Sequence, residues 1–231
     1  MRIKVLICAA ALAAASAFTS MAQNVYSLNA VGYINIPLVE GFNLIANQLD
    51  FDGTGTNNTT SNILGTNVPL NSAVYTWAGS TYNIATFAVP KGQTAGAWNK
   101  NFTLNPGQGA WLDIPAGGLA GTSSNLTTVG QVDQGALVNK NLAAGGGYSL
   151  LGSMVPIQGG IQTVLNYSPV VGDTVYQWNP TTSSYTISTF AIPKGGTQAV
   201  WGKSEPVIGI GQGFWLNSGA ASMWSNYFIV Q

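Results

Sequence analysis

The chain of 231 residues contains one sequence unit twice, and this internal repetition limits the folds that it can adopt. Residues 86–92 read Thr-Phe-Ala-Val-Pro-Lys-Gly and residues 189–195 read Thr-Phe-Ala-Ile-Pro-Lys-Gly, so six of the seven positions are identical. Residues 107–112 (Gly-Gln-Gly-Ala-Trp-Leu) return as residues 211–216 (Gly-Gln-Gly-Phe-Trp-Leu). Self-similarity of this kind indicates one structural unit that is used twice.

Differences in length between the two copies locate the loops. The segment from Trp77 to Tyr82 is shorter than the matching segment from Trp178 to Tyr185. A polar connection of variable length between two aromatic segments is typical of a hairpin loop. The repeat therefore predicts β-hairpins rather than helices.

Alternating or short apolar segments predict the strands. In the first unit these segments are residues 33–36, 42–49, 74–77, 82–87 and 110–114, and the second unit repeats them and ends with residues 226–230. Single helical turns are predicted at residues 61–64 and 161–165, because no longer window keeps a helical period.

The fold class is therefore predicted to be all-β, with tandem duplicated β-sandwich or barrel-like modules and minimal helix. The modules are residues 23–130 and 131–231, with a seam near residues 127–135. Residues 121–125 and 133–135 have the polar, Gly-containing composition of a connector. A single domain with pseudo-twofold symmetry is the alternative.

The N-terminal segment has the pattern of an export signal. Arg2 and Lys4 precede an uncharged apolar run over residues 5–18, and Ser20-Met21-Ala22 fits a cleavage site. We predict that residues 1–22 form a signal peptide and that the mature chain is secreted or lies on the outer surface of a Gram-negative cell. No later apolar run approaches the ~20 residues of a membrane-spanning helix, so no transmembrane helix is expected in the mature chain.

Composition excludes several chemistries. The chain has no His, and only 6% of its residues are charged. A His-based metal site or catalytic relay is therefore excluded, and a nucleic acid partner is not expected because no basic face can form. We expect no cofactor.

Two further segments and one motif resemble the sequences of a known protein family. The segments are residues 25–33 (Val-Tyr-Ser-Leu-Asn-Ala-Val-Gly-Tyr) and residues 41–47 (Gly-Phe-Asn-Leu-Ile-Ala-Asn). A Gly-x-Gly-Phe-Trp motif follows nearer the C-terminus, at residues 211–215. The matching segment of the first unit differs from this motif, because it has Ala110 in place of Phe. The chain thereby resembles a family of secreted, internally duplicated β-rich proteins of environmental Gram-negative bacteria. That family has no assigned activity, so the resemblance implies location and architecture only.

Aromatic residues are the most numerous candidates for ligand binding. Exposed indole rings can stack on sugar rings, whereas repeat-matched Trp residues beside apolar neighbours are typical of a core. Trp98 and Trp201 lie in segments read as loops and are therefore the preferred sugar-stacking candidates, together with Trp224. The sequence leaves the core interpretation open for each of them.

Asp50 and Asp52 begin a Gly-containing loop that resembles a calcium loop, because oxygen ligands alternate there before a turn. The fifth position is Thr54 and the twelfth is Ser61, which depart from the calcium pattern. A polar Gly turn after a strand is the alternative interpretation.

The Gly-Gln-Gly motifs precede strands rather than helices, so they predict close backbone approach and not phosphate binding.

We therefore predict a non-enzymatic, secreted or cell-surface structural or adhesive protein that self-associates or binds extracellular matrix. The alternative is a carbohydrate-binding module that holds a surface polysaccharide with exposed Trp and Tyr. A hydrolase would need two converging carboxyl groups, and no acidic residue recurs at matched positions of both units. A candidate assembly strand, which would pair with the sheet edge of a neighbouring subunit, is formed by Asn24, Val25, Tyr26, Ser27 and Leu28.

Overall fold

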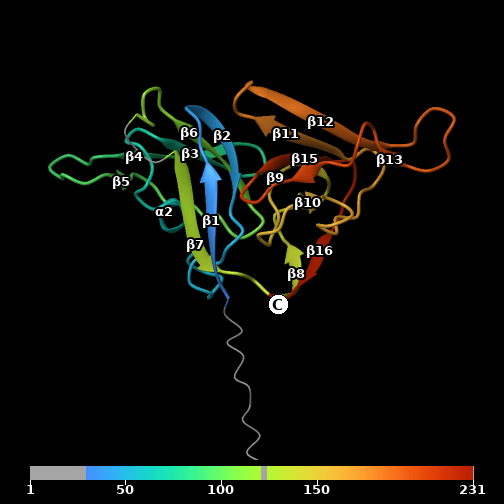
Figure 1. Ribbon diagram of the computed structural model, residues 1–231, viewed down its shortest axis with the longest axis horizontal. Helices are drawn as coiled ribbons and strands as arrows, with labels where there is room; N and C mark the ends of the chain where they lie inside the picture. The colour runs from blue at the N-terminus through green and yellow to red at the C-terminus, as the bar shows by residue number, and fades with distance from the viewer. Residues whose placement is uncertain (1–29, 121–123, 231) are drawn as a thin grey trace, which may run out of the picture.

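A computed structural model describes residues 30–120 and 124–230 (Figure 1). The described chain is almost entirely β-structure, which confirms the predicted fold class. Its one α-helix is α2 (Thr60–Leu64), at the position predicted for a helical turn. The predicted signal peptide and the candidate assembly strand lie outside the described residues.

The strands divide into a first half, which ends at Gln131, and a second half, which begins at Val132. The first half contains β1 (Val31–Pro37), β2 (Gly41–Ala46), β3 (Ala73–Trp77), β4 (Tyr82–Ala88), β5 (Ala97–Trp98), β6 (Gly109–Ile114) and β7 (Asn125–Gln131). The second half contains β8 (Gly135–Asn139), β9 (Gly147–Leu151), β10 (Gly159–Gly160), β11 (Thr174–Asn179), β12 (Ser184–Ala191), β13 (Val200–Trp201), β14 (Val207–Ile208), β15 (Phe214–Ser218) and β16 (Trp224–Phe228).

The two halves have the same antiparallel topology. The first half forms a five-stranded sheet in the order β2-β6-β3-β4-β5, and the second forms β9-β15-β11-β12-β13. Each half adds a two-stranded ribbon, β1–β7 or β8–β16. Figure 1 shows the two halves side by side, with both ribbons extending away from the sheets on the same side of the molecule.

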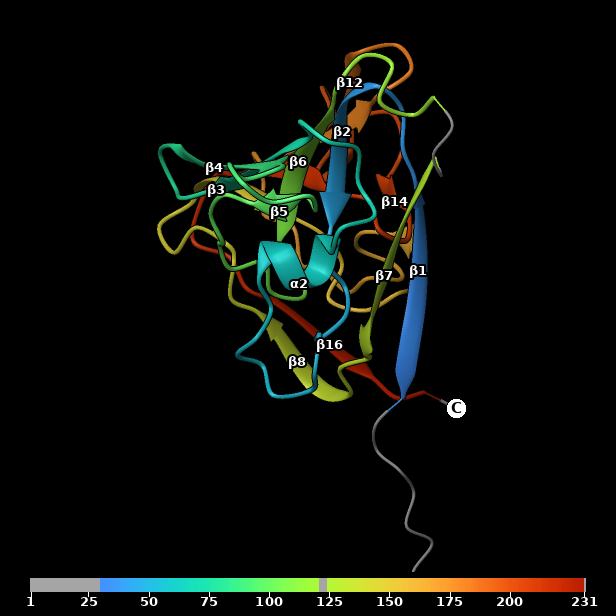
Figure 2. The same ribbon diagram turned by 90° about the vertical axis from the view of Figure 1, so that its left-hand side faces the viewer.

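Each half has its own hydrophobic core on one face of its five-stranded sheet. Val74, Ala85 and Leu112 alternate with more exposed residues along their strands and are completely buried in the first core. Val175 and Leu216 are the counterparts of Val74 and Leu112 in the second core. Helix α2 packs against β7 beside the first sheet (Figure 2). Alternation of buried and exposed residues therefore leaves the opposite face of each sheet available for other contacts.

Part of the predicted seam between the units is a strand. Residues 125–131 form strand β7, which pairs along its whole length with β1. Its sequence, Asn-Leu-Thr-Thr-Val-Gly-Gln, carries few apolar residues, but Leu126 and Thr128 alternate inward and are buried. The connection between the halves is only residues 132–134.

Within the described residues, no helix is long and apolar enough to cross a membrane.

The halves are joined by reciprocal backbone hydrogen bonds. The N–H of Ala46 in the first half donates to the carbonyl of Gly211 at 2.8 Å, and the N–H of Gly152 in the second half donates to the carbonyl of Gly107 at 3.0 Å. The two bonds are equivalent, because each connects the end of β2 or β9 with the Gly-Gln-Gly turn of the other half. The repeated motif is therefore the means by which the halves dock.

Candidate functional site

Cross-strand register gathers the large aromatic side chains on the sheet faces opposite the two cores. In the first sheet, Trp111 of β6 lies between Leu44 of β2 and Tyr75 of β3. In the second sheet, Trp215 of β15 lies between Leu150 and Tyr176 in the same way. The joined surface, called the aromatic face below, is formed by Phe42, Tyr75, Trp77, Tyr82, Trp111, Tyr148, Tyr176, Trp178, Tyr185 and Trp215.

The β3–β4 and β11–β12 hairpins reach across to the opposite half. Trp77 packs edge-on against Trp215 with ring centroids 5.2 Å apart, and Trp178 packs against Trp111 at 5.3 Å. The indole Nε1 of Trp77 donates to the carbonyl of Tyr148 at 3.2 Å, and the Nε1 of Trp178 donates to the carbonyl of Phe42 at 2.7 Å. The aromatic pairs therefore join the two halves, and exchanging the halves maps each contact onto an equivalent one.

Two hollows open on the aromatic face. The first has a volume of about 330 Å³ and is lined by Phe42, Tyr75, Tyr82, Trp111, Trp178 and Tyr185. The second has a volume of about 480 Å³ and is lined by Trp77, Tyr82, Tyr148, Tyr176, Tyr185, Ile187 and Trp215. Tyr82 and Tyr185 line both hollows, so the two are contiguous. Both halves contribute to each hollow, and neither hollow would exist in a separate half.

Tyr82 and Tyr185 are fixed by equivalent ring contacts. Tyr82 stacks edge-on against Trp77 at 5.1 Å, and Tyr185 stacks edge-on against Trp178 at 5.0 Å. Burial raises the pKa of Tyr82, and a hydrogen bond with Trp111 opposes part of the rise. Burial also raises the pKa of Tyr185, with a further electrostatic contribution from Tyr82. Both hydroxyl groups are therefore neutral at physiological pH, when each can donate and accept a hydrogen bond.

The aromatic face is open to ligands. Phe42 and Tyr148 are 45% and 50% exposed, and Tyr82 and Tyr185 are 40% and 41% exposed. Trp111 and Trp215 form the floors of the hollows and are more than nine-tenths buried. Rigid aromatic walls with a few phenolic hydroxyl groups suit a flat or ring-shaped ligand that has apolar faces and polar edges.

The hollows carry no ionic group among their lining residues. On the same sheet face, Asp113 lies directly opposite Phe42 in the strand register, and its counterpart Asn217 lies opposite Tyr148. Phe42 is likewise replaced by Tyr148 in the second half. The two hollows therefore differ in one lining residue that can form hydrogen bonds, since Tyr148 of the second has a hydroxyl group that Phe42 of the first lacks.

The three predicted sugar-stacking Trp residues lie elsewhere and are not brought together. Trp224 is completely buried, and its Nε1 donates to the carbonyl of Leu165. Trp201 is 7% exposed and pairs with Phe190 in β13, and Trp98 occupies the equivalent place in β5. Trp98 and Trp201 thus lie in short paired strands rather than in the predicted loops, and Trp201 and Trp224 are buried rather than exposed. Trp98 is half-buried, and its Nε1 donates to the carbonyl of Gly65.

The two predicted calcium ligands are engaged in hydrogen bonds. The carboxylate of Asp50 is 5% exposed and accepts from the N–H of Gly55 and the amide of Asn58. The carboxylate of Asp52 accepts from Thr54 and Asn57, and these hydrogen bonds lower its pKa. Within residues 30–120 and 124–230, no three acidic, His or Cys side chains form a group suited to a metal ion. The turn interpretation accounts for both aspartates, and the calcium site stays a prediction.

A third hollow, of about 190 Å³, brings two acidic residues from different halves together. Asp50 and Asp133 both line it, with Lys140 beside them. Burial raises the pKa of Asp133, and the negative charge of Asp50 raises it further. Because both oxygens of Asp50 already accept hydrogen bonds from residues 55 and 58, Asp50 anchors its own loop.

The aromatic face was missed because repetition reveals equivalent residues but not the partners of those residues. The signal that could have found it is the alternation of aromatic residues along Tyr75-Thr76-Trp77 and Tyr176-Gln177-Trp178, in strands whose other face is already apolar. Such a strand buries one face in its core and presents the other to a partner or a ligand.

No family model, curated protein or solved structure matches the chain. The resemblance to secreted, duplicated β proteins therefore stays a prediction.

Proposed function

We propose that the protein is an exported, non-enzymatic binding protein that attaches to neutral polysaccharide through the aromatic face. The observation that carries the proposal is the pair of open, uncharged hollows whose walls are Trp and Tyr rings from both halves. The N-terminal pattern of a signal peptide supports an extracellular place of action.

Sugar rings match the chemistry of this surface. A pyranose ring presents C–H groups on its faces and hydroxyl groups at its edge, so an aromatic ring can cover the face while phenolic hydroxyls bond to the edge. The rigid rings lose little conformational entropy on binding, because their packing against one another already holds them in place. An absence of ionic groups in the hollows favours an uncharged polymer over an acidic one.

The proposal is tested by binding of the mature protein to a panel of neutral and acidic polysaccharides, followed by tryptophan fluorescence and affinity electrophoresis. We expect neutral polymers with accessible ring faces to bind and to change the Trp emission. The double variant Tyr82→Ala/Tyr185→Ala should lose at least tenfold in affinity, because each residue lines both hollows.

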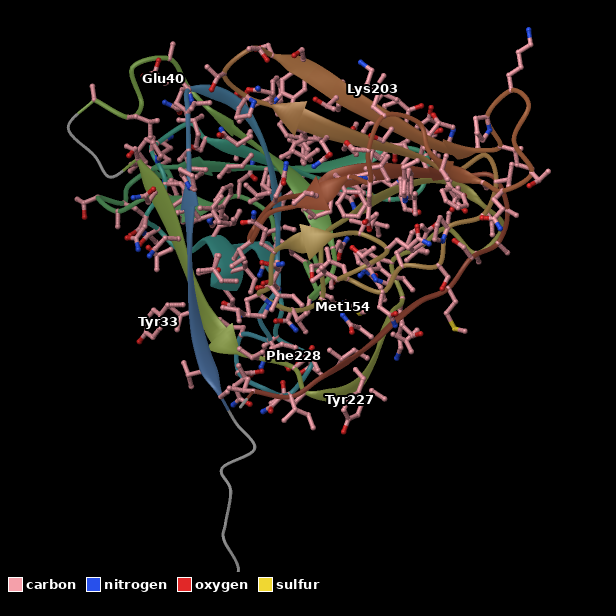
Figure 3. All side chains as sticks on the ribbon, turned by 45° about the vertical axis from the view of Figure 1, so that its right-hand side comes forward. Tyr33, Glu40, Met154, Lys203, Tyr227 and Phe228 are labelled. Carbon is pink, nitrogen blue, oxygen red and sulfur yellow. The ribbon has the colours of Figure 1, made fainter. Side chains whose placement is uncertain are left out.

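The matched control is Tyr33→Ala/Tyr227→Ala. These tyrosines are 72% and 69% exposed, and Figure 3 shows them on the two ribbons. Neither of them lines a hollow. The control should bind as the unmodified protein does. Equal binding by both double variants, or no binding of any polymer in the panel, would contradict the proposal.

Self-association is a second candidate function, favoured by exposed apolar residues on the ribbons. Tyr33 of β1 lies directly opposite Val129 of β7, which is 41% exposed. On the other ribbon, Val138 is 47% exposed beside β16, which carries Tyr227. An apolar surface of this kind can associate with a second copy, and the near-zero net charge of the chain leaves little repulsion to oppose it.

Sedimentation velocity over a range of protein concentrations tests self-association. We expect a species larger than the monomer, and we expect Tyr33→Lys/Tyr227→Lys to shift it to the monomer. A monomer at all concentrations in the unmodified protein would remove this candidate.

A further inference from the structure

Resting on the proposed polysaccharide binding, we infer that the ligand is one neutral polysaccharide chain that lies across both hollows, and that it binds in either direction. The two hollows are continuous with each other. Tyr82 and Tyr185 are the shared walls, and no residue that lines either hollow is charged. A chain that occupies one hollow can therefore continue past these two rings into the other.

The hollows are large enough for a ligand of several units. Their volumes of about 330 and 480 Å³ are each near the lower part of the range of small-molecule sites, which is roughly 300–1,000 Å³. One hollow thus holds a short oligosaccharide. Linking two such ligands makes the second contact intramolecular, which raises the apparent affinity without any new kind of contact.

Either direction of binding follows from the near-twofold arrangement of the walls. Phe42 contacts Trp111 edge-on at 5.8 Å, and its counterpart Tyr148 contacts Trp215 edge-on at 6.1 Å. A twofold rotation exchanges the two hollows and reverses the direction of a chain that crosses the axis. A polysaccharide chain, whose two ends differ, therefore contacts nearly the same aromatic walls in both orientations.

The two directions are not equivalent in energy, because the rims differ. Tyr148 lines the second hollow and lies opposite the neutral Asn217 in the strand register, whereas Phe42 lines the first hollow and lies opposite Asp113. The side-chain hydrogen bond between Tyr148 and Tyr176 raises the pKa of Tyr176, so polar groups already meet at this rim. We expect the second hollow to be the tighter of the two for a neutral sugar.

The decisive experiment is a length series measured by isothermal titration calorimetry on the mature protein. The probes are cello-, chito- and laminari-oligosaccharides of two to eight units. For the series that binds, we expect two trisaccharides per protein but one hexasaccharide, with a hexasaccharide affinity at least tenfold higher. A hexasaccharide that binds no more tightly than the trisaccharide would overturn the spanning chain while leaving the proposed function intact. If no series binds and no polymer in the panel binds, both fall.

Two single variants separate the hollows. Phe42→Ala removes a wall of the first hollow only, and Tyr148→Ala removes a wall of the second only. Both side chains are about half exposed, so each variant should fold, which the near-ultraviolet circular dichroism would check. Each variant should bind one trisaccharide and should lose the tenfold advantage of the hexasaccharide. If one variant abolishes binding of both probes, the hollows do not act as two linked sites.

Direction is tested with a hexasaccharide that carries a nitroxide spin label at its reducing end. For a chain that binds in both orientations, NMR signals of Phe42 and of Tyr148 should both broaden in the unmodified protein. Broadening confined to one of the two rings would show a single direction and overturn that part of the inference.

Discussion

Ala46 and Gly152 occupy equivalent positions in the two halves and face each other where the halves dock. A Cβ atom built on Gly152 would overlap the Cβ of Ala46, so only one of the two positions can carry a methyl group. Both residues are buried, and the N–H of each donates to the Gly-Gln-Gly turn of the other half. The contact between the halves therefore depends on a small difference between two otherwise equivalent residues.

Substitution of Gly152 by Ala should destabilise the protein by about 1–3 kcal/mol, because overpacking of a closed contact forces the backbone apart. The double variant Ala46→Gly/Gly152→Ala moves the methyl group to the other half and restores the fit. We expect it to be more stable than the sum of the two single variants predicts, which urea unfolding of all four proteins would measure.

The control for this cycle is Gly145→Ala, because no atom lies within 4 Å of a Cβ at that position. Its free energy of unfolding should stay within about 0.5 kcal/mol of the unmodified value. Strictly additive effects of Ala46→Gly and Gly152→Ala would contradict the proposed contact.

The glycines of the repeated motif should be equally restrictive. A Cβ on Gly109 would lie 2.9 Å from the carbonyl oxygen of Leu151, and a Cβ on Gly213 would lie 3.0 Å from the carbonyl carbon of Ile45. Both neighbours are backbone atoms of the other half, which cannot move without opening the interface. We expect Gly109→Ala and Gly213→Ala each to cost about 1–3 kcal/mol in thermal or urea unfolding. An unchanged midpoint for both variants would exclude this role.

The exchanged indole hydrogen bonds give a third test. Trp77→Phe and Trp178→Phe keep an aromatic ring but remove the donors to the carbonyls of Tyr148 and Phe42. Each variant should lose about 0.5–1.5 kcal/mol of stability, the usual net value of one hydrogen bond. Trp98→Phe is the matched control, because its lost bond to Gly65 lies within one half.

Ligand binding distinguishes a hydrogen bond lost between the halves from one lost within a half. All three variants should be destabilised, but only Trp77→Phe and Trp178→Phe should also weaken polysaccharide binding, since their rings line the hollows. Equal effects of all three on binding would mean that the aromatic face does not depend on the docking of the halves.

Local sequence patterns predicted the parts of the fold that depend on neighbouring residues. The aromatic and apolar alternation over residues 74–77 and 82–87 corresponds to β3 and β4, and the repeat predicted their counterparts. Strand β7 was missed because Leu126 is the one apolar side chain among its three buried positions, and the other two are Thr128 and Gly130. Its partner β1 lies almost a hundred positions earlier, so nothing local identifies the pair.

The aromatic face was harder to predict, because it forms only where the two repeat units pack against each other. Trp77 and Trp111 belong to the same unit, yet each makes a close indole contact with the other unit, through Trp215 and Trp178. Periodicity shows that one face of a strand is free, but the packing of one hairpin over the opposite sheet decides which rings remain accessible. The loop candidates Trp98 and Trp201 were chosen without that information and lie in short paired strands.

Two aspartates should respond to pH in opposite directions. The pKa of Asp133 is raised by burial, so its contribution to stability is present below about pH 4 and is lost as the pH rises through the folded pKa. The pKa of Asp52 is lowered by hydrogen bonds from Asn57 and Thr54, so its contribution is present above about pH 4 and is lost as the pH falls. At pH 7, Asp133→Asn should raise the unfolding midpoint in urea and Asp52→Asn should lower it. The same sign for both variants would contradict the two opposite environments.

Tyr167 should control the alkaline limit of stability in the second half. Its hydroxyl donates to the carboxylate of Asp173 at 2.6 Å, and both residues are at least 99% buried. Burial and the hydrogen bond to Asp173 raise the pKa of Tyr167, because a phenolate would be held without water beside a carboxylate. The folded pKa therefore exceeds the unfolded value of about 10, and the stabilisation is complete below that pH and is lost as the pH rises above it. At pH 7, Tyr167→Phe should cost about 1–3 kcal/mol, since Asp173 loses a donor.

Because the Phe variant cannot ionise at this position, its stability should fall less steeply above pH 10 than that of the unmodified protein. The difference in unfolding free energy between the two proteins should thus shrink as the pH rises, which urea titrations at a series of pH values would measure. Tyr33→Phe is the control, because Tyr33 is 72% exposed and its loss should leave the pH profile unchanged. A constant difference between Tyr167→Phe and the unmodified protein across the alkaline range would mean that the buried pair does not set this limit.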